Sequence, residues 1–287
     1  MLQPCSSVKA LLGEGPHWDP STGCLWFVDI TGQRIFCYNP ATEQTESFRF
    51  EDTVSTWVPR AQGGAVLTLG RRFCAWDWQT GQLNPLAEVE PDLPNNRFND
   101  GKCDAKGRFW AGTLDKGESE PLGALYCLDV DLSVRKVLDG VTVSNGLGWS
   151  PDNRTMYYID TPTHLVFAFD FDLDRGTLSN RREILRIDQG MPDGMTVDAE
   201  GMLWIAHWGG ARVSRWDPMR ATLLEEHPLP VDRVTSLAFG GPELTQLFVT
   251  TARQGLPSET AGRQPFAGHL FTMTTSVPGL LAYSFGG

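Results

Sequence analysis

Short apolar and aromatic runs of four to seven residues make up most of the chain, and Gly, Pro, Asn or Asp interrupt them every 8 to 12 residues. Runs of this length that are rich in Trp, Phe, Tyr, Val and Thr are typical of β-strands. No long stretch shows the 3.6-residue spacing of apolar positions that marks an amphipathic helix. The pattern therefore predicts an all-β protein.

A motif recurs along the chain, in which a polar residue precedes a short strand, a turn follows, and a second, aromatic-rich strand comes next. The six copies start at Glu14, Thr56, Asn99, Asn145, Asp193 and Ser236, with the copies at 56 and 236 the weaker ones. The starts are 42, 43, 46, 48 and 43 residues apart. Units of about 45 residues match a four-stranded propeller blade, so we predict a six-bladed β-propeller with four-stranded blades.

The second halves of the units support this interpretation. Apolar runs that read as third strands lie at residues 34–40, 123–129, 165–170 and 212–218. We expect residues 1–287 to form one propeller domain, in which the last blade has its third strand at residues 268–272 and the N-terminal segment 6–11 supplies the outer strand. Two stacked all-β domains without a repeat are the alternative, and the agreement of the six spacings favours the propeller.

Composition and charge then restrict the partners. The chain of 287 residues has 24 Lys and Arg against 35 Asp and Glu, a net charge of −11, and its basic blocks are no longer than two arginines. Binding to a phosphate backbone needs clustered cations, so we expect no nucleic acid partner. No apolar stretch reaches the about 18–20 residues that cross a bilayer, and no basic segment followed by an apolar one opens the chain. We expect no membrane association, a cytoplasmic location, and a monomer or weak homo-oligomer.

Cysteine usage agrees with a reducing compartment. The six cysteines are spread over the first half of the chain without a C-x-x-C pair. Neither a zinc ribbon nor a disulfide framework is indicated. We expect reduced and mostly buried thiols.

The six polar residues that open the units suggest a metal site. The innermost strand of each propeller blade runs along the central channel, so equivalent positions converge at one mouth. Among the six are two carboxylates, Glu14 and Asp193, and two carboxamides, Asn99 and Asn145. Buried carboxylates need partners, and oxygen donors suit Ca²⁺, Mg²⁺ or Mn²⁺, with Zn²⁺ as a borderline choice. The alternative is that Asn-Gly and Asp-Gly pairs only mark turns.

Other catalytic templates are absent from the sequence. It has no G-x-S-x-G, H-E-x-x-H, phosphate-binding or dinucleotide-binding motif, and its five histidines show no ligand spacing. His17 reads as a packed strand residue. The loops between second and third strands open at the same mouth, where Lys116, His207 and Arg253 are candidate substrate contacts.

Several motifs together resemble those of the SMP-30/gluconolactonase/luciferin-regenerating-like family, over essentially the whole chain. They are L-G-E-G-P at 12–16, N-R-F-N-D-G-K at 96–102, S-N-G-L-G-W at 144–149, Y-Y-I-D at 157–160, P-D-G-M at 192–195, D-A-E-G at 198–201 and R-Q-P at 263–265. The resemblance implies a six-bladed propeller with one catalytic divalent metal, in a family of which many members hydrolyse sugar lactones. It further implies that Glu14, Asn145 and Asp193 hold the metal and that Arg97 and Asn99 contact the substrate.

The hypothesis is therefore metal-assisted opening of a sugar lactone to the aldonic acid, with Asp193 as the catalytic proton carrier. Arg97 and Asn99 would bind sugar hydroxyls, with Lys116 and His207 as further contacts. One departure concerns the substrate: family members often have a glutamate after G-T-M, where this chain has Asp115-Lys116-Gly117. Two alternatives stay open: a calcium-binding regulatory propeller without catalysis, and a lactonase or esterase for a non-sugar or organophosphate substrate.

Overall fold

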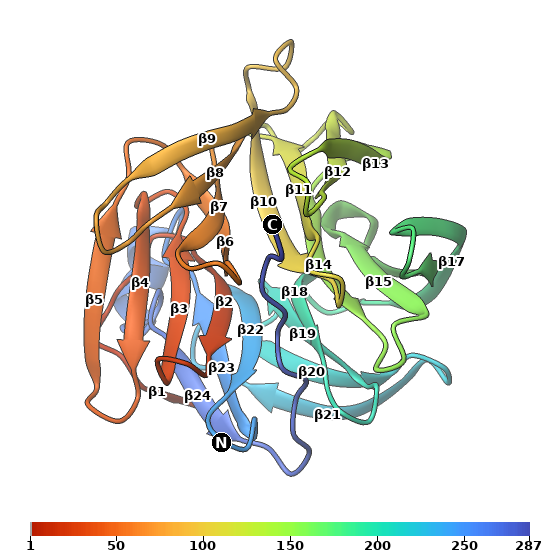
Figure 1. The fold of residues 1–287 in the computed structure, drawn as a ribbon. Coiled ribbons are helices and arrows are strands. Elements are labelled where there is room, and N and C mark those ends of the chain that lie inside the picture. The colour runs from red at the N-terminus through yellow and green to blue at the C-terminus, as the bar shows by residue number, and fades with distance from the viewer. Residues whose placement is uncertain (1) are drawn as a thin grey trace.

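The fold is a ring of six antiparallel four-stranded sheets around a central channel, seen in a computed structural model that describes residues 2–287 (Figure 1). The all-β six-bladed propeller predicted from the repeat is confirmed. The helical segments among the described residues are the 3₁₀ turn η1 (Thr161–Thr163) and the short helix α1 (Ser258–Arg263). No helix in that part of the chain is long and apolar enough to cross a membrane.

The strands take the same four places in every blade. The innermost strands are β2 (Gly13–Asp19), β6 (Val54–Pro59), β10 (Asn96–Cys103), β14 (Ser144–Trp149), β18 (Met191–Val197) and β22 (Val234–Gly240). The second strands are β3 (Cys24–Asp29), β7 (Ala65–Leu69), β11 (Phe109–Asp115), β15 (Thr155–Asp160), β19 (Leu203–Trp208) and β23 (Gln246–Thr251). The third strands are β4 (Arg34–Asn39), β8 (Arg72–Trp76), β12 (Gly123–Leu128), β16 (Leu165–Asp172), β20 (Arg212–Asp217) and β24 (Phe271–Thr274). The outer strands are β5 (Gln44–Arg49), β9 (Leu83–Glu88), β13 (Val134–Val141), β17 (Thr177–Arg186), β21 (Thr222–Pro228) and β1 (Gln3–Pro4).

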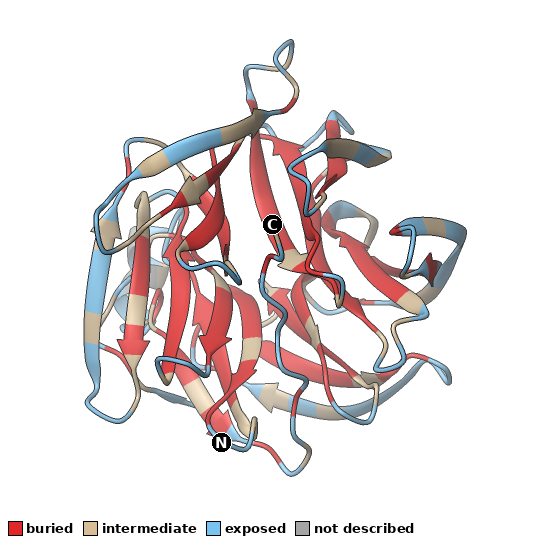
Figure 2. Ribbon diagram, in the orientation of Figure 1, coloured by how far each residue is buried: buried red, intermediate tan, exposed pale blue. Residues whose placement is uncertain are grey.

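Burial decreases from the channel outward (Figure 2). The first and second strands are buried over nearly their whole length, and the outer strands carry most of the exposed residues. The apolar clusters lie between neighbouring blades: Trp26 of β3 packs on Trp57 of β6 with ring centroids 4.9 Å apart, and Trp76 of β8 joins the same cluster. Because apolar faces of adjacent sheets bury one another, large aromatic residues recur in each unit.

The N-terminus supplies the outer strand of the last blade, but from other residues than the sequence predicted. Gln3 and Pro4 pair with Thr272 and Phe271 of β24. The predicted segment 6–11 follows as an irregular connection, in which the Ala10 amide donates to the Gly268 carbonyl at 2.9 Å. The pairing of the first and last elements joins the two ends of the ring.

The cysteines match the prediction of reduced, mostly buried thiols. All six are free; Cys24, Cys74, Cys103 and Cys127 are buried and the other two are partly buried. Burial raises the pKa of the Cys74 thiol to about 11, so this thiol stays protonated at neutral pH.

The C-terminal residues 278–287 cross the channel at the mouth opposite the unit-opening polar residues; we call them the C-terminal strap. One end is held where Gly279 bridges to Asp198 and the other where Phe285 bridges to Arg60. Phe285 is fully buried in the apolar cluster that contains Phe98, whereas Leu281 and Tyr283 between the two anchors are 48% and 43% exposed. The strap therefore lies across this rear mouth.

Candidate functional site

Each innermost strand carries a β-bulge near its front end, and the unit-opening polar residues lie at these bulges. The pairing with the second strand shifts by one residue between 14 and 17, 54 and 57, 98 and 101, 145 and 147, 192 and 195, and 234 and 236. The sequence predicted these residues just before the strands; they lie within them. A bulge bends the strand and redirects side chains, so it turns these polar groups toward the channel.

The glycines that follow Asn145 and Asp193 have a different role from the turn signal considered above. A Cβ on Gly146 would lie 2.6 Å from the Asp193 carbonyl oxygen of the next blade. Glycine is therefore required because adjacent innermost strands approach each other closely at the bulge. The Asn-Gly pair places an amide where two blades meet.

The channel brings Glu14, Asn145 and Asp193 together from β2, β14 and β18, and each is at most 5% exposed. Burial, together with the negative charge of Asp100, raises the pKa of Glu14 to about 8. Burial and the Glu14 charge raise the pKa of Asp193 well above its usual range. Two carboxylates that repel each other in a buried place are a suitable setting for a cation.

The donor atoms of this group fit a divalent cation. Asp193 Oδ1 and Asn145 Oδ1 are buried and have no hydrogen-bond partner. Asn145 Nδ2 donates to Thr161 Oγ1 at 3.0 Å, which fixes the amide with its oxygen free. Among the described residues no group of three or more His, Cys, Asp or Glu side chains could hold a metal, so a site here needs the Asn145 oxygen beside the two carboxylates. An all-oxygen set suits Ca²⁺, Mg²⁺ or Mn²⁺.

Arg97 and Asn99 of β10 form a separate, paired group. Arg97 Nη1 donates to Asn99 Oδ1 at 2.7 Å and to the Phe98 carbonyl at 2.9 Å. Asn99 Nδ2 donates to the Ser144 carbonyl at 2.8 Å. The Asn99 amide is thus satisfied on both sides, which sets it apart from Asn145 as a metal ligand. The Arg97 guanidinium, with Nε and Nη2 outside these bonds, retains donors for a substrate.

Asp100 and Lys102 were part of the recognised motif but received no role from the sequence. Asp100 is 3% exposed, and its Oδ2 is without a partner. Lys102 Nζ donates to the Met195 carbonyl across the channel, and burial lowers the pKa of this ammonium group. In a regular strand the side chains of Asn99 and Asp100 would point to opposite faces of the sheet. The bulge between Phe98 and Gly101 changes this alternation, and the sequence alone does not reveal the bulge.

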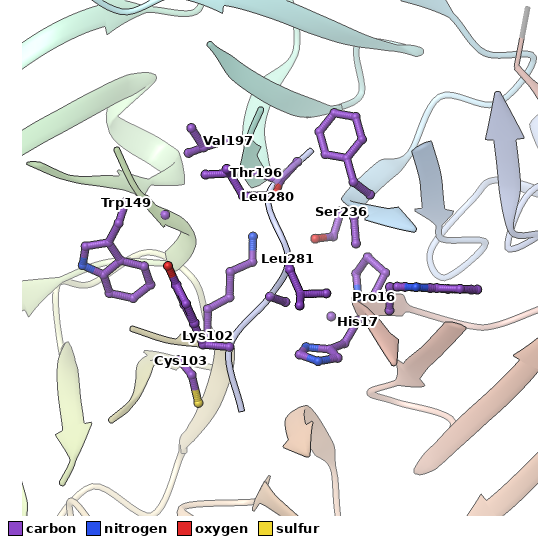
Figure 3. Close-up of a pocket in the computed structure, with 18 of the residues that line it drawn as sticks. Pro16, His17, Lys102, Cys103, Trp149, Thr196, Val197, Ser236, Leu280 and Leu281 are labelled. Atoms are coloured by element: carbon purple, nitrogen blue, oxygen red, sulfur yellow. The ribbon is translucent and has the colours of Figure 1, made fainter. Parts of the chain in front are cut away.

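Asp100 and Lys102 border a cavity of about 120 Å³ between the site and the C-terminal strap. Figure 3 shows Lys102 extending into the channel, with His17, Trp149 and Ser236 around it and Leu281 of the strap beside it. His17 is buried and its ring lies 5.5 Å from that of Trp57, as expected for a packed strand residue. The cavity lies in the channel behind the candidate site, against the C-terminal strap.

His207 does not lie in a loop at the mouth, where the sequence predicted it as a candidate substrate contact. His207 lies inside β19 and is fully buried. Its Nδ1 contacts the Gln189 carbonyl at 2.8 Å and its Nε2 contacts Ser214 Oγ on the neighbouring β20. Burial lowers the pKa of the ring to about 4. Both ring nitrogens are therefore used within the blade, and none is left for a ligand.

The front loops hold the remaining candidates. Lys116 is exposed in the connection from β11 to β12, where its backbone amide donates to the Asn95 carbonyl at 3.2 Å. Arg253 is also exposed, and its Nε donates to the Lys9 carbonyl at 3.2 Å. Glu118, in the same connection as Lys116, was missed: its charge acts on Arg97 and Asp193. Glu118 follows Gly117 by one position, close to where the family pattern has its glutamate.

Comparison with known proteins connects this geometry to a family. Residues 12–253 match the family described as the SMP-30/Gluconolactonase/LRE-like region. Regucalcin of Xenopus laevis is 42% identical over 285 residues, which cover 96% of this chain and 95% of that protein. A solved luciferin-regenerating enzyme has a TM-score of 0.94 at 32% identity, covering 100% of this chain and 99% of that one. A calcium-binding protein, regucalcin of Agrobacterium tumefaciens, has a TM-score of 0.94 at 27% identity, covering 98% and 96%.

Proposed function

This chain belongs to the SMP-30/gluconolactonase/LRE-like family, and from that premise we propose that it is a metal-dependent hydrolase that opens sugar lactones to aldonic acids. The observation that carries the proposal is the buried set of Glu14, Asn145 and Asp193, in which two oxygen atoms have no partner. Buried polar atoms are rarely left unpaired unless a ligand or ion satisfies them. The neighbouring Arg97 supplies donors for hydroxyl groups.

In the proposed mechanism, Glu14, Asn145 and Asp193 hold one divalent cation, with Ca²⁺, Mg²⁺, Mn²⁺ and Zn²⁺ as candidates. When bound, such a cation polarises the lactone carbonyl and stabilises the negative charge that develops on its oxygen, an effect worth several kcal/mol. Asp193 accepts a proton from the attacking water as the new C–O bond forms. It then returns the proton to the ring oxygen as the ring C–O bond breaks.

Arg97 and Asn99 orient the sugar in this proposal. The hydrogen bond from Arg97 to Asn99 fixes the guanidinium against β10. The remaining N–H groups of Arg97 are therefore held in one orientation in which they can donate to the sugar. Lys116 and Glu118, on the loop above, are further contacts for hydroxyl groups. The strap crosses the rear mouth, so in this proposal substrate enters and product leaves at the front.

A panel of esters tests the substrate class. We expect hydrolysis of aldonolactones, followed with a pH indicator, to exceed hydrolysis of non-sugar lactones and of an organophosphate ester. Faster hydrolysis of a non-sugar lactone or of the organophosphate ester would mean that the enzyme acts on that class of ester. Metal binding without hydrolysis of any ester would instead support a calcium-binding protein without catalysis, a possibility favoured by the description of the Agrobacterium relative.

Metal binding should stabilise the protein more at pH 8 than at pH 5. Without metal, the raised pKa values mean that the folded protein binds Glu14 and Asp193 protons that the unfolded chain has released. The free energy of unfolding therefore falls as the pH rises from the ordinary Glu value of 4.5 toward 8, and a cation removes that loss. We expect the metal-induced rise in Tm to be larger at pH 8 by at least about 2–4 °C.

Thermal unfolding with EDTA or with added Ca²⁺ or Mn²⁺ at the two pH values measures this difference. The Glu14→Gln variant is the control, because it removes one titrating carboxylate and should reduce the pH dependence. An equal metal-induced rise in Tm at both pH values would contradict the assignment of the buried carboxylates to a metal.

A further inference from the structure

Glu90, in the connection between β9 and β10, has an unusual backbone conformation. Its φ angle is +53°, in the left-handed region that is uncommon for residues other than Gly, Asn and Asp. Arg71 Nη1 donates to the Glu90 carbonyl at 2.7 Å, and the Leu93 amide donates to the same oxygen at 3.0 Å. The surrounding chain thus holds this residue in a conformation that costs about 1–2 kcal/mol.

The Glu90 carboxylate joins three strands of the third blade. Its Oε2 accepts from Asn96 Nδ2 of β10 at 2.8 Å. Its Oε1 accepts from Thr113 Oγ1 of β11 at 2.8 Å and from Tyr126 Oη of β12 at 3.2 Å. In the part of the chain that the structure describes, no Lys or Arg forms an ion pair with it. All three partners are neutral donors, which fix the carboxylate by geometry.

Asn96 connects this carboxylate to the front of the channel. It directly precedes Arg97, and its Nδ2 also donates to the Leu122 carbonyl at 2.9 Å, at the end of the loop that carries Lys116 and Glu118. The same loop is tied at its other end, where Asn95 Nδ2 contacts Asp115 Oδ1. One amide therefore links Glu90, the start of β10 and the 116–122 loop.

We propose that Glu90 is a positioning residue for the substrate: through Asn96 it sets Arg97 and the 116–122 loop at a fixed place relative to the metal ligands. This inference rests on the proposed function of Arg97. The metal ligands are on β2, β14 and β18, in three other blades. Loss of the Glu90 contacts should therefore weaken substrate binding and leave metal binding unchanged.

The test compares Glu90→Ala with Glu90→Gln. The alanine variant loses all three hydrogen bonds, and we expect KM for an aldonolactone to rise about 10- to 100-fold, the scale of a misplaced binding group, with kcat changed less than about threefold. The glutamine variant should keep KM within about threefold of the parent, because its amide oxygen can accept from Asn96 and the hydroxyls of Thr113 and Tyr126 can accept from its N–H groups. Metal affinity, measured by titration calorimetry, should be equal in all three proteins.

A second pair of variants tests the link through Asn96. Asn96→Asp places a carboxylate against that of Glu90, so we expect the same rise in KM. Combining it with Glu90→Gln restores a donor between the two positions and should recover at least about a third of the loss in log KM, as expected for directly coupled residues. Glu88→Ala is the matched control, because Glu88 is two residues away and binds the same Arg71 at 3.0 Å; its KM should equal that of the parent protein.

An unchanged KM in Glu90→Ala, or equal losses in the alanine and glutamine variants, would overturn the positioning role. Deuterium exchange keeps this test separate from the proposed function. If the parent protein hydrolyses no lactone and binds no aldonate, the proposed function fails, and the amides of the 116–122 loop should still exchange faster in Glu90→Ala than in Glu90→Gln. Equal exchange in those two variants would overturn the positioning role on its own.

Discussion

The Asp193→Asn variant is expected to bind a divalent metal and to lose about 10²- to 10⁴-fold in kcat for lactone hydrolysis. An asparagine keeps an oxygen donor at the position of Asp193 Oδ1, which has no partner within the protein. It cannot accept a proton from water, because an amide is not basic.

Steady-state kinetics and metal titration on the same preparation check this expectation. Asp188→Asn is the control, since Asp188 is exposed in the connection just before β18 and undergoes the same chemical change. Near-normal turnover by the Asp193→Asn protein with its metal bound would show that another group carries the proton. Loss of both metal and turnover would leave Asp193 as a ligand only.

Phe285→Ala should lower the free energy of unfolding by about 3–5 kcal/mol, the cost of removing a fully buried phenylalanine. Phe285 has no exposed surface and packs with Phe98 and Phe109 between the second and third blades. Its backbone amide donates to the Pro59 carbonyl at 2.8 Å, so the ring anchors the strap to the turn after β6. The substitution removes the buried ring and keeps the backbone hydrogen bonds of the strap, such as that from the Gly286 amide to the Gly107 carbonyl at 3.0 Å.

Denaturant unfolding measures the change, with Tyr283→Ala as the control. Tyr283 lies two residues away in the same strap but is 43% exposed, and its loss should cost no more than about 0.5 kcal/mol. Similar small effects in both variants would mean that the buried Phe285 ring does not hold the strap in place.

The propeller could be predicted from the sequence because each blade repeats a local pattern. An aromatic-rich second strand, such as Cys24–Asp29 or Leu203–Trp208, follows a turn at a constant distance from its polar residue. The repeat of about 45 residues is visible in the sequence because every blade must bury the same two sheet faces against its neighbours. The partner of a strand, in contrast, depends on the register between segments far apart in sequence. For this reason the sequence predicted the outer strand of the last blade at residues 6–11, whereas Gln3 and Pro4 form it.

The candidate site was predicted in part for the same reason. Equivalent positions in a repeat must converge, which identified Glu14, Asn99, Asn145 and Asp193 as a group. The family resemblance then implied the metal set of Glu14, Asn145 and Asp193, which the structure brings together. Their bulges could not be seen in the sequence, because a bulge is defined by an extra residue relative to the partner strand. The sequence predicted His207 in a loop at the mouth, but a polar residue near a strand end can also face the interior of the blade. There the His207 ring forms a hydrogen bond with Ser214 on the next strand.

The roles of Glu90 and Glu118 could not be predicted from the repeat. Glu90 connects the second blade to the third and Glu118 lies in a loop of the third; both have a positive φ angle, +53° and +55°. Their roles depend on the hydrogen bond between Asn96 and Glu90 and on the charge of Glu118 near Arg97, which only the folded loops create. Loop residues of this kind are where members of one fold differ in substrate.

The most direct test of a metal-dependent lactonase is the rate of aldonolactone hydrolysis before and after removal of divalent metal. The protein should lose its activity in EDTA and regain it on titration with Ca²⁺, Mg²⁺, Mn²⁺ or Zn²⁺, reaching a plateau at one metal per chain. The Asn145→Ala variant should need at least about 10-fold more metal, because one of three oxygen donors is missing. Hydrolysis that continues undiminished in EDTA, in protein shown to be free of metal, would contradict the account.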